Sequence, residues 1–157
     1  MKNINIQILL LRLALGALFL NAGLSKINDG WLTSDQELLS SLTTYQQKAS
    51  TDWQKRYLET VALPYVSIWA KMIPLGEVAL GASLLLGLLT RFSTAMGIIM
   101  VLNLHAANGN LFTFGFFQTP YAALVLACLL ALFLSRAGRW FGFDYYLSKS
   151  NAKSFFW

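Results

Sequence analysis

Residues 73–91 of the chain read Ile73-Pro-Leu-Gly-Glu-Val-Ala-Leu-Gly-Ala-Ser-Leu-Leu-Leu-Gly-Leu-Leu-Thr-Arg91. The stretch is apolar and long enough to cross a bilayer, and it is rich in small residues. One carboxylate, Glu77, lies inside the apolar run. Because an ionisable side chain in hydrocarbon is costly and is nearly always paired, Glu77 predicts a basic or hydrogen-bonding partner elsewhere in the chain.

The composition of the whole chain is typical of a membrane protein. Its 157 residues are 56% hydrophobic and 12% charged, whereas about 25% of the residues are charged in soluble domains. The length predicts a single domain over residues 1–157. One cysteine, Cys128, excludes an internal disulfide and a Cys-x-x-Cys pair in this sequence. One histidine, His105, excludes bis-histidine haem ligation by this sequence alone. Electron transfer would therefore need a bound organic cofactor or a partner protein.

The hydrophobic pattern predicts an all-α integral membrane protein with a bundle of four transmembrane helices. The spans are expected at residues 4–26, 66–90, 92–111 and 118–136. Pro74 is expected to kink the second span. Arg12 inside the first run, the length of that run and the lack of a small-x-small cleavage site argue against a cleaved signal peptide. Aromatic residues before the fourth span are expected at a membrane interface; they are Phe112, Phe114, Phe116 and Phe117.

A polar insertion, residues 28–63, separates the first two spans. Ser34-Asp-Gln-Glu37 and Thr51-Asp-Trp-Gln54 match the capping box that begins a helix. Trp53, Tyr57 and Val61 then follow at the spacing of one helix face. Two short amphipathic helices are expected. They would lie on the membrane surface with the aromatic side down, or pack on the bundle as a helical hairpin, and the two interpretations can hold together.

Charge is expected to orient the bundle. Four spans place both termini on one side, where Asp144 is the only expected acid. The basic residues of that side are Lys2, Arg91, Arg136, Arg139, Lys149 and Lys153. Because cytoplasmic loops are enriched in Lys and Arg, both termini are expected inside, in the cytoplasmic membrane of a bacterium or archaeon. The insertion would then face outward.

Helix geometry gives each polar residue of the spans an expected depth. At about 1.5 Å per residue, Arg12 would lie roughly 10 Å and Asn21 roughly 24 Å from the inner face. Glu77 would lie near the middle of the second span, and Asn103 near the same depth in the third. We therefore predict that Arg12 pairs with Glu77 and that Asn103 faces them.

Two interpretations of this cluster stay open. In the first, Arg12 and Glu77 form a structural lock, and small residues let the helices approach closely; these are Gly16, Gly23, Gly76, Gly81 and Ser83. In the second, a pocket opens outward with Glu77 at its floor and Lys26 and Lys71 at its mouth. Such a pocket suits a small anion or a quinone headgroup. His105 is the candidate proton carrier, because its ordinary pKa is near neutrality.

Three segments of the chain resemble the DoxX/DoxD family of small four-helix membrane proteins. Residues 11–26 resemble the family's opening Arg…Gly…Ala-Gly…Lys pattern. Gly76-Glu77 followed by Leu-Leu-Leu-Gly-Leu-Leu-Thr-Arg91 resembles its most characteristic segment, and Ala137-Gly-Arg-Trp-Phe-Gly-Phe-Asp144 its close. The resemblance covers nearly the whole chain, and the long insertion is closer to DoxD-type members.

The resemblance implies a membrane subunit of a quinone-linked oxidoreductase. DoxD-type proteins are associated with a thiosulfate:quinone oxidoreductase, which oxidises thiosulfate to tetrathionate, reduces quinone and works with a second subunit, DoxA. The family's recurring polar positions correspond to Arg12, Lys26, Glu77, Arg91 and Asp144. The catalytic candidates are Glu77, His105 and Arg12. The candidate ligands of substrate or quinone are Lys26, Lys71, Asn103, Asn21 and Arg91. A quinone is the expected cofactor, and no metal, haem or flavin motif is evident.

Two other function classes remain alternatives. One is a non-catalytic structural or accessory subunit of a larger respiratory or photosynthetic membrane complex. The other is a small-solute binder or carrier, which with four spans would need to oligomerise. The expected partners are the lipid bilayer and a membrane or periplasmic subunit, which could be DoxA-like, or further copies of the chain. No segment of the sequence is typical of a nucleic-acid-binding face. Because the sequence ends at Trp157, no fused DoxA is expected.

Overall fold

The computed structural model describes residues 2–110, 120–139 and 141–150, and these are helical apart from short connections, with no strand among them. This confirms the expected all-α class. The elements are α1 (Lys2–Asn28), α2 (Gln36–Lys48), α3 (Asp52–Tyr57), the π-helical η1 (Leu58–Ala62), α4 (Val66–Leu86), α5 (Thr90–Ala107), α7 (Pro120–Ser135), the 3-10 turn η2 (Ala137–Arg139) and α8 (Phe143–Ser150).

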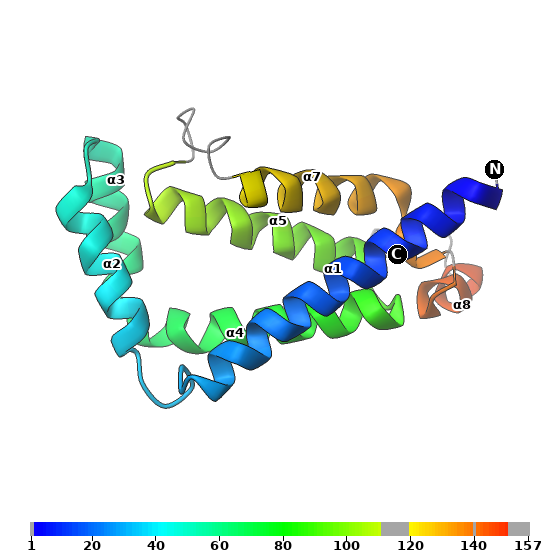
Figure 1. Ribbon diagram of the computed structural model, residues 1–157, viewed down its shortest axis with the longest axis horizontal. Helices are drawn as coiled ribbons and strands as arrows, with labels where there is room; N and C mark the ends of the chain where they lie inside the picture. Colours follow the sequence, from blue (N-terminus) through cyan, green and yellow to red (C-terminus); the bar gives the residue numbers. More distant parts are fainter. Residues whose placement is uncertain (1, 111–119, 140, 151–157) are drawn as a thin grey trace.

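α1, α4, α5 and α7 run along the long axis of the molecule, and the other described elements lie toward its two ends (Figure 1). α1 packs mainly on α4, α5 packs on both α4 and α7, and α7 returns to α1. α2 and α3 lie across one end, which we call the insertion end. The start of α1, η2 and α8 lie at the opposite end, which we call the terminal end.

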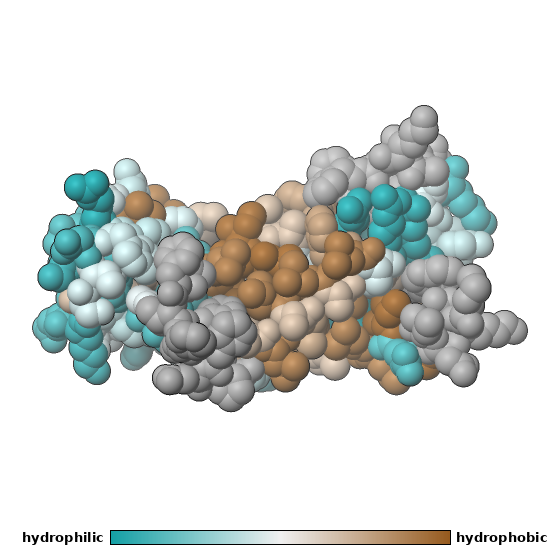
Figure 2. Space-filling view, turned by 90° about the horizontal axis from the view of Figure 1, so that it is seen from above, coloured by the Kyte–Doolittle hydropathy of each residue, from teal (hydrophilic) through white to brown (hydrophobic). Residues whose placement is uncertain are grey.

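The middle of the molecule has a hydrophobic surface. Figure 2 shows a hydrophobic waist between two more hydrophilic ends. Residues Ile6–Asn28 and Val66–Leu86 are each long and apolar enough to cross a membrane, and Tyr121–Ser135 is a shorter apolar helix. The spans expected at 92–111 and 118–136 correspond to α5 and α7, which are shorter than expected. The expected interfacial residues Phe112, Phe114, Phe116 and Phe117 lie outside the described residues.

The turn between α4 and α5 comes earlier than the sequence predicts. α4 ends at Gly87, whose φ of 67° is the left-handed conformation that glycine adopts readily. Leu89 is also left-handed, with a φ of 51°, and α5 begins directly after it. The predicted second span, 66–90, therefore runs past the true end of the helix.

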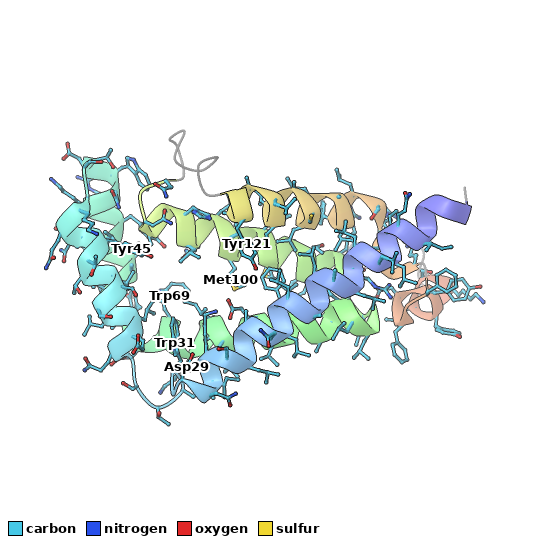
Figure 3. The ribbon with its side chains drawn as sticks, viewed as in Figure 1. Asp29, Trp31, Tyr45, Trp69, Met100 and Tyr121 are labelled. Atoms are coloured by element: carbon cyan, nitrogen blue, oxygen red, sulfur yellow. The ribbon has the colours of Figure 1, made fainter. Side chains whose placement is uncertain are left out.

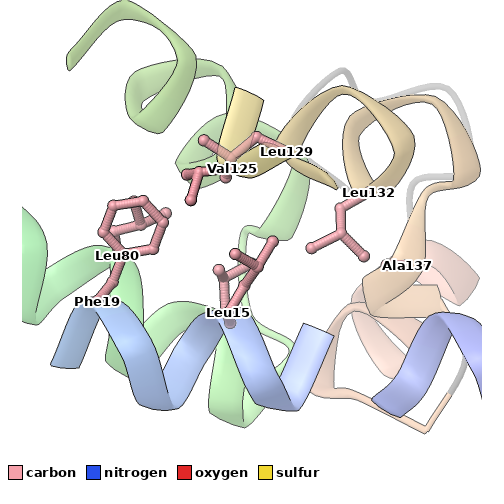
Figure 4. Close-up of a cluster of buried hydrophobic side chains, with 8 residues drawn as sticks. Leu15, Phe19, Leu80, Val125, Leu129, Leu132 and Ala137 are labelled. Carbon is pink, nitrogen blue, oxygen red and sulfur yellow. The ribbon is translucent and has the colours of Figure 1, made fainter. Parts of the chain in front are cut away.

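The main hydrophobic core joins α1, α4 and α7. Phe19 and Leu15 of α1 meet Leu80 of α4 and Leu129 of α7 (Figure 4). Glycines bring α1 and α4 into backbone contact, because a Cβ at Gly81 would lie 2.7 Å from the Cα of Leu20. Gly16 and Gly23 lie at the same interface, as predicted. Gly76 does not, since a Cβ added there would lie 4.0 Å from the Met100 sulfur.

The insertion packs on the bundle through a second core. Leu38 and Leu42 of α2 and Leu58 of η1 cluster with Ala70 of α4 and Ala107 of α5. Trp31 and Trp69 also pack against this cluster (Figure 3). These contacts support the packed-hairpin interpretation.

Two local predictions for the insertion were wrong in detail. The buried stripe of the second helix is Gln54, Leu58 and Ala62, one residue away from the predicted aromatic stripe. The second helix begins after Thr51, as its capping box predicts, but the Thr51 side chain does not cap it. α2 begins one residue later than predicted, with Asp35 as its N-cap, and the Gln36 N–H donates to the Ser34 hydroxyl at 3.3 Å. Asp35 instead accepts a hydrogen bond from the Ser67 hydroxyl, because the insertion folds back onto the start of α4.

Candidate functional site

Lys26 and Glu77 form an ion pair in the apolar part of the molecule. The Lys26 Nζ donates to both carboxylate oxygens of Glu77, at 2.8 Å to Oε1 and 2.6 Å to Oε2. The exposed fraction of the side chain is 12% for Glu77 and 26% for Lys26. The pair is therefore largely removed from solvent, and Lys26 has the more open side. Charge-assisted bonds of this length are among the stronger ones in proteins.

The close contact between α1 and α4 brings the two residues together. A Cβ at Gly23 would lie 2.7 Å from the carbonyl oxygen of Pro74, so only glycine allows this approach. α1 and α4 run in opposite directions, and the same Cβ would lie 2.8 Å from the backbone nitrogen of Val78, the residue after Glu77. Glu77 is therefore level with Gly23, and the long Lys26 side chain, about one helical turn further along α1, reaches back to it.

An indole ring covers one side of the ammonium group. The Lys26 Nζ lies 5.8 Å from the centroid of the Trp31 ring, a distance at which a cation is attracted to the ring face. Trp31 belongs to the connection between α1 and α2, near the insertion end. The pair is therefore bounded by α1, α4 and the first residues of the insertion.

The predicted pairing of Arg12 with Glu77 is wrong. Arg12 is buried at the terminal end, where its Nη1 donates to the Ala137 carbonyl at 2.9 Å and its Nη2 to the Phe141 carbonyl at 2.9 Å. The same guanidinium packs against Gly87, at the end of α4. Glu77 lies ten residues earlier in that helix, or about 15 Å along its axis. A side chain at Arg12 cannot reach it.

Asp144 organises the terminal end, and we call its surroundings the Asp144 node. The Asp144 Oδ1 accepts the Leu89 N–H at 2.6 Å, and its Oδ2 accepts the Thr90 N–H at 2.9 Å and the Thr90 hydroxyl at 2.6 Å. The Thr90 Oγ1 in turn accepts the Gly138 N–H at 3.0 Å. A carboxylate from the C-terminal segment thus caps α5, whose first N–H groups have no partner within the helix.

The node also holds two strained residues. Leu89 and Phe141 have backbone φ angles of 51° and 54°, which residues other than glycine rarely adopt. Asp144 binds the N–H of Leu89, and Arg12 binds the carbonyl of Phe141. Because surrounding bonds must maintain such conformations, Arg12 and Asp144 act here as structural residues.

Two hydrogen bonds join the end of α5 to the insertion, and a third lies within that end of the helix. Asn103 hydrogen bonds the Tyr57 side chain; burial raises the pKa of that phenol, and the bond to Asn103 lowers it by less. His105 is buried, and its Nδ1 lies 3.3 Å from the amide of Asn108 in the same helix. Gln54 donates to the Ala107 carbonyl at 3.1 Å. These contacts fasten the insertion to the end of α5.

The remaining predicted site residues are dispersed. Asn21 of α1 and Lys71 of α4 are exposed, and Lys71 precedes Glu77 on the side of the insertion. Arg91 lies at the terminal end, with its guanidinium carbon 4.8 Å from the centroid of the Phe133 ring. The structure therefore joins Lys26 and Glu77, and it places Arg12 and Arg91 at the other end of the bundle.

Comparison with protein families gives one match. The DoxX family model matches residues 7–107, from α1 to the end of α5. The chain belongs to the DoxX family. The matched part of this DoxX protein contains both members of the Lys26–Glu77 pair and Arg12, whereas Asp144 follows it. The comparisons found no match among curated proteins or among solved structures.

The family and the hydrophobic waist together make the chain a DoxX-family membrane protein. Among the residues that the structure describes, no group of three or more His, Cys, Asp or Glu side chains could hold a metal ion. The chemistry of the Lys26–Glu77 pair is that of hydrogen bonding and proton exchange. It can donate to a carbonyl or anion through Lys26 and accept a proton at Glu77.

Sequence reasoning named both members of the pair but did not pair them. The available signal was the glycine spacing, because Gly16, Gly23 and Gly81 fix the register of α1 against α4. Thr90 had no predicted role, and Gln54 was predicted only as the last residue of a capping box. Each of them bonds a distant segment. Nothing in the sequence near either residue indicates which distant segment that is.

Proposed function

We propose that this DoxX protein is a four-span subunit of a quinone-linked oxidoreductase in the cytoplasmic membrane of a bacterium or archaeon. The lengths support four spans: α5 has 18 residues and α7 has 16, which correspond to about 27 and 24 Å against a hydrocarbon core of about 30 Å. α7 is apolar throughout, and α5 packs against both α4 and α7.

Charge supports an orientation with the termini inside. The terminal end contains Arg91, Arg136, Arg139 and Lys149, and Asp144 is its only acid among the described residues. The insertion end contains acids and bases in similar numbers. The positive-inside rule therefore favours a cytoplasmic terminal end and an insertion that faces outward.

The Lys26–Glu77 pair is the single observation that carries the functional proposal. A charged pair in the apolar part of a membrane protein is costly, and such pairs commonly mark ligand or proton pathways. Lys26 would donate a hydrogen bond to one carbonyl oxygen of a quinone. Glu77 would exchange the proton that this oxygen gains on reduction.

The balanced reaction follows that of the DoxD-type enzymes the sequence resembles. Two thiosulfate ions lose two electrons and form tetrathionate, and one quinone gains those electrons with two protons and becomes quinol. Lys71, exposed on the outward half of α4, would contribute positive charge for the sulfur oxyanion. Electron transfer would involve a DoxA-like partner. His105 and Asn103 would support this end of the site through α5.

The test is the redox activity and the quinone content of the purified protein. We expect quinone to copurify, and we expect thiosulfate-dependent quinone reduction once a DoxA-like partner is added. Glu77→Gln should lower both, whereas Lys55→Gln, an exposed control in the insertion, should lower neither. Absence of quinone together with absence of activity in the presence of the partner would refute the proposal.

One observation favours a second candidate, a non-catalytic subunit of a larger membrane complex. Lys26 already satisfies both oxygens of Glu77, so the pair is complete without a ligand. In that case the double variant Lys26→Met/Glu77→Gln should assemble normally and keep host function. Loss of host function with intact assembly would exclude this candidate.

A further inference from the structure

The exposed face of α1 contains an amide side chain at the depth of the hydrocarbon. The apolar run of this helix is Ile6–Asn28, so its central residue is Ala17, and Asn21 lies four residues, or about 6 Å, beyond that centre. A hydrocarbon core about 30 Å thick extends about 15 Å to either side of its middle. Asn21 therefore belongs inside the core, where water cannot hydrogen bond to its side chain.

This amide has no partner among the residues that the structure describes. The Asn21 side chain is exposed, and no hydrogen bond joins it to any described residue. An amide left unpaired in hydrocarbon is costly, because it has given up its hydrogen bonds to water without replacing them. The described exposed residues of α5 and α7 are all apolar or aromatic, as expected where a helix faces lipid. The exposed face of α1 differs from theirs at Asn21.

The residues around Asn21 fit the contact face of a second helix. Exposed positions recur along α1 at alternating steps of four and three residues, and they are Leu10, Ala14, Ala17, Asn21 and Leu24. An average step of about 3.5 residues keeps one face against a neighbouring helix in a left-handed pair. Ala14 and Ala17 have small side chains that allow close approach, and amide side chains hydrogen bond across such contacts in membranes.

We propose that this face of α1 binds the same face of a second copy of the chain, with the two Asn21 amides hydrogen bonded to one another. An amide both donates and accepts hydrogen bonds, so two copies can satisfy each other. All copies insert with the same orientation, and a twofold axis along the membrane normal therefore places both Asn21 side chains at one depth. A different partner would need its own polar group at that depth, whereas a second copy supplies it by symmetry. The proposal rests on the membrane location and not on the oxidoreductase activity.

Dilution of the full-length protein in lipid vesicles tests the proposal. Copies labelled with donor or acceptor fluorophores would be reconstituted over a range of protein-to-lipid ratios, and energy transfer would report the dimer. The wild type should dimerise, and Asn21→Leu should weaken dimerisation by about tenfold, because it removes the hydrogen bonds between the helices. Asn21→Gln keeps the amide and should keep most of the dimerisation. A monomeric wild type at every ratio, or equal dimerisation of the wild type and Asn21→Leu, would overturn the proposal.

A change of bulk gives a second test with a matched control. Ala17→Phe places a large ring within the contact and should lower dimerisation in the same vesicles. Ala79→Phe makes the same change on the exposed face of α4 and should leave dimerisation as in the wild type. Both alanines are exposed, so both variants should fold. Equal dimerisation of the two variants would contradict the assignment to α1.

Cross-linking locates the contact directly. Cys128 is the single cysteine of the sequence, so Cys128→Ala provides a background without thiols. In that background, Ala17→Cys should form a disulfide between two copies on oxidation, and Ala79→Cys should not. Cross-linking at position 79 alone would overturn the assignment. So would the loss of copurified quinone from an Asn21→Leu variant that dimerises normally, because the amide would then serve a ligand and not a second copy.

Discussion

Removing the Lys26 charge alone should destabilise the protein more than removing both charges of the Lys26–Glu77 pair. Lys26→Met leaves the Glu77 carboxylate, whose side chain is 12% exposed, without its donor. Breaking a buried pair in this way costs about 3–4 kcal/mol. Glu77→Gln leaves the Lys26 ammonium, which is 26% exposed and can turn toward water, so its cost should be about 2 kcal/mol. The double variant removes both charges and should cost at most about 2 kcal/mol.

The four proteins form a double-mutant cycle, and the expected coupling energy is about 3 kcal/mol. The free energy of unfolding would be measured in mixed micelles by titration with SDS. A parallel cycle of Arg12→Met with Glu77→Gln is the matched control, because the two residues are about 15 Å apart along the bundle and should be additive within about 0.5 kcal/mol. Coupling below about 0.5 kcal/mol between Lys26 and Glu77, or strong coupling between Arg12 and Glu77, would refute the register of α1 on α4.

Three other predictions follow from the packing. Asp144→Asn weakens the cap of α5 and leaves donors poorly matched, so it should lower the free energy of unfolding by about 2–3 kcal/mol, as measured by the same SDS titration. Gly81→Ala should cost about 2 kcal/mol or more, because its Cβ would overlap the backbone of Leu20; Gly76→Ala, with open space around it, should change stability by less than about 1 kcal/mol. Because burial raises the pKa of Tyr57 above its unfolded value of 10.0, its stabilising contribution is complete below pH 10 and is lost as the pH rises through the folded pKa. Alkaline loosening of the insertion, followed by amide hydrogen exchange of α3, should therefore be smaller in Tyr57→Phe, and equal loosening in both proteins would exclude Tyr57 as its cause.

The elements of the fold were largely predictable because they depend on local sequence. Apolar runs of sufficient length indicated α1 and α4, and the turn signals near Ser34 and Thr51 indicated where the insertion helices begin. The end of α4 was predicted too late, because Leu88 and Leu89 continue the apolar run after Gly87 has already reversed the chain. Hydropathy shows which residues can lie in a bilayer. It does not show where the helix ends, which here depends on the left-handed Gly87.

The partners of the charged residues were not predictable by depth alone. The depths were estimated by counting residues from the first apolar residue of α1, which assumes that this residue lies at the membrane face. α1 begins at Lys2, and Arg12 lies level with the end of α4, at Gly87. An error of a few residues in where each helix enters the membrane shifts the estimated depths. In two antiparallel helices these shifts add when the depths of their residues are compared. The contact at Gly23 and Pro74 fixes the register more tightly than any hydropathy profile, because it is a steric requirement of the two backbones.

The polar residues singled out by the family resemblance therefore lie in two places that differ in their interactions. Arg12 and Asp144 bind backbone groups of three segments and hold strained turns, so their substitution should impair folding whether or not the protein has a ligand. Lys26 and Glu77 bind only each other among the described hydrogen bonds, and the Lys26 side is partly open. A loss of function in an Arg12 or Asp144 variant thus carries no information about chemistry. Only the Lys26–Glu77 pair, compared as single and double variants of equal folded yield, can separate a ligand site from a structural lock.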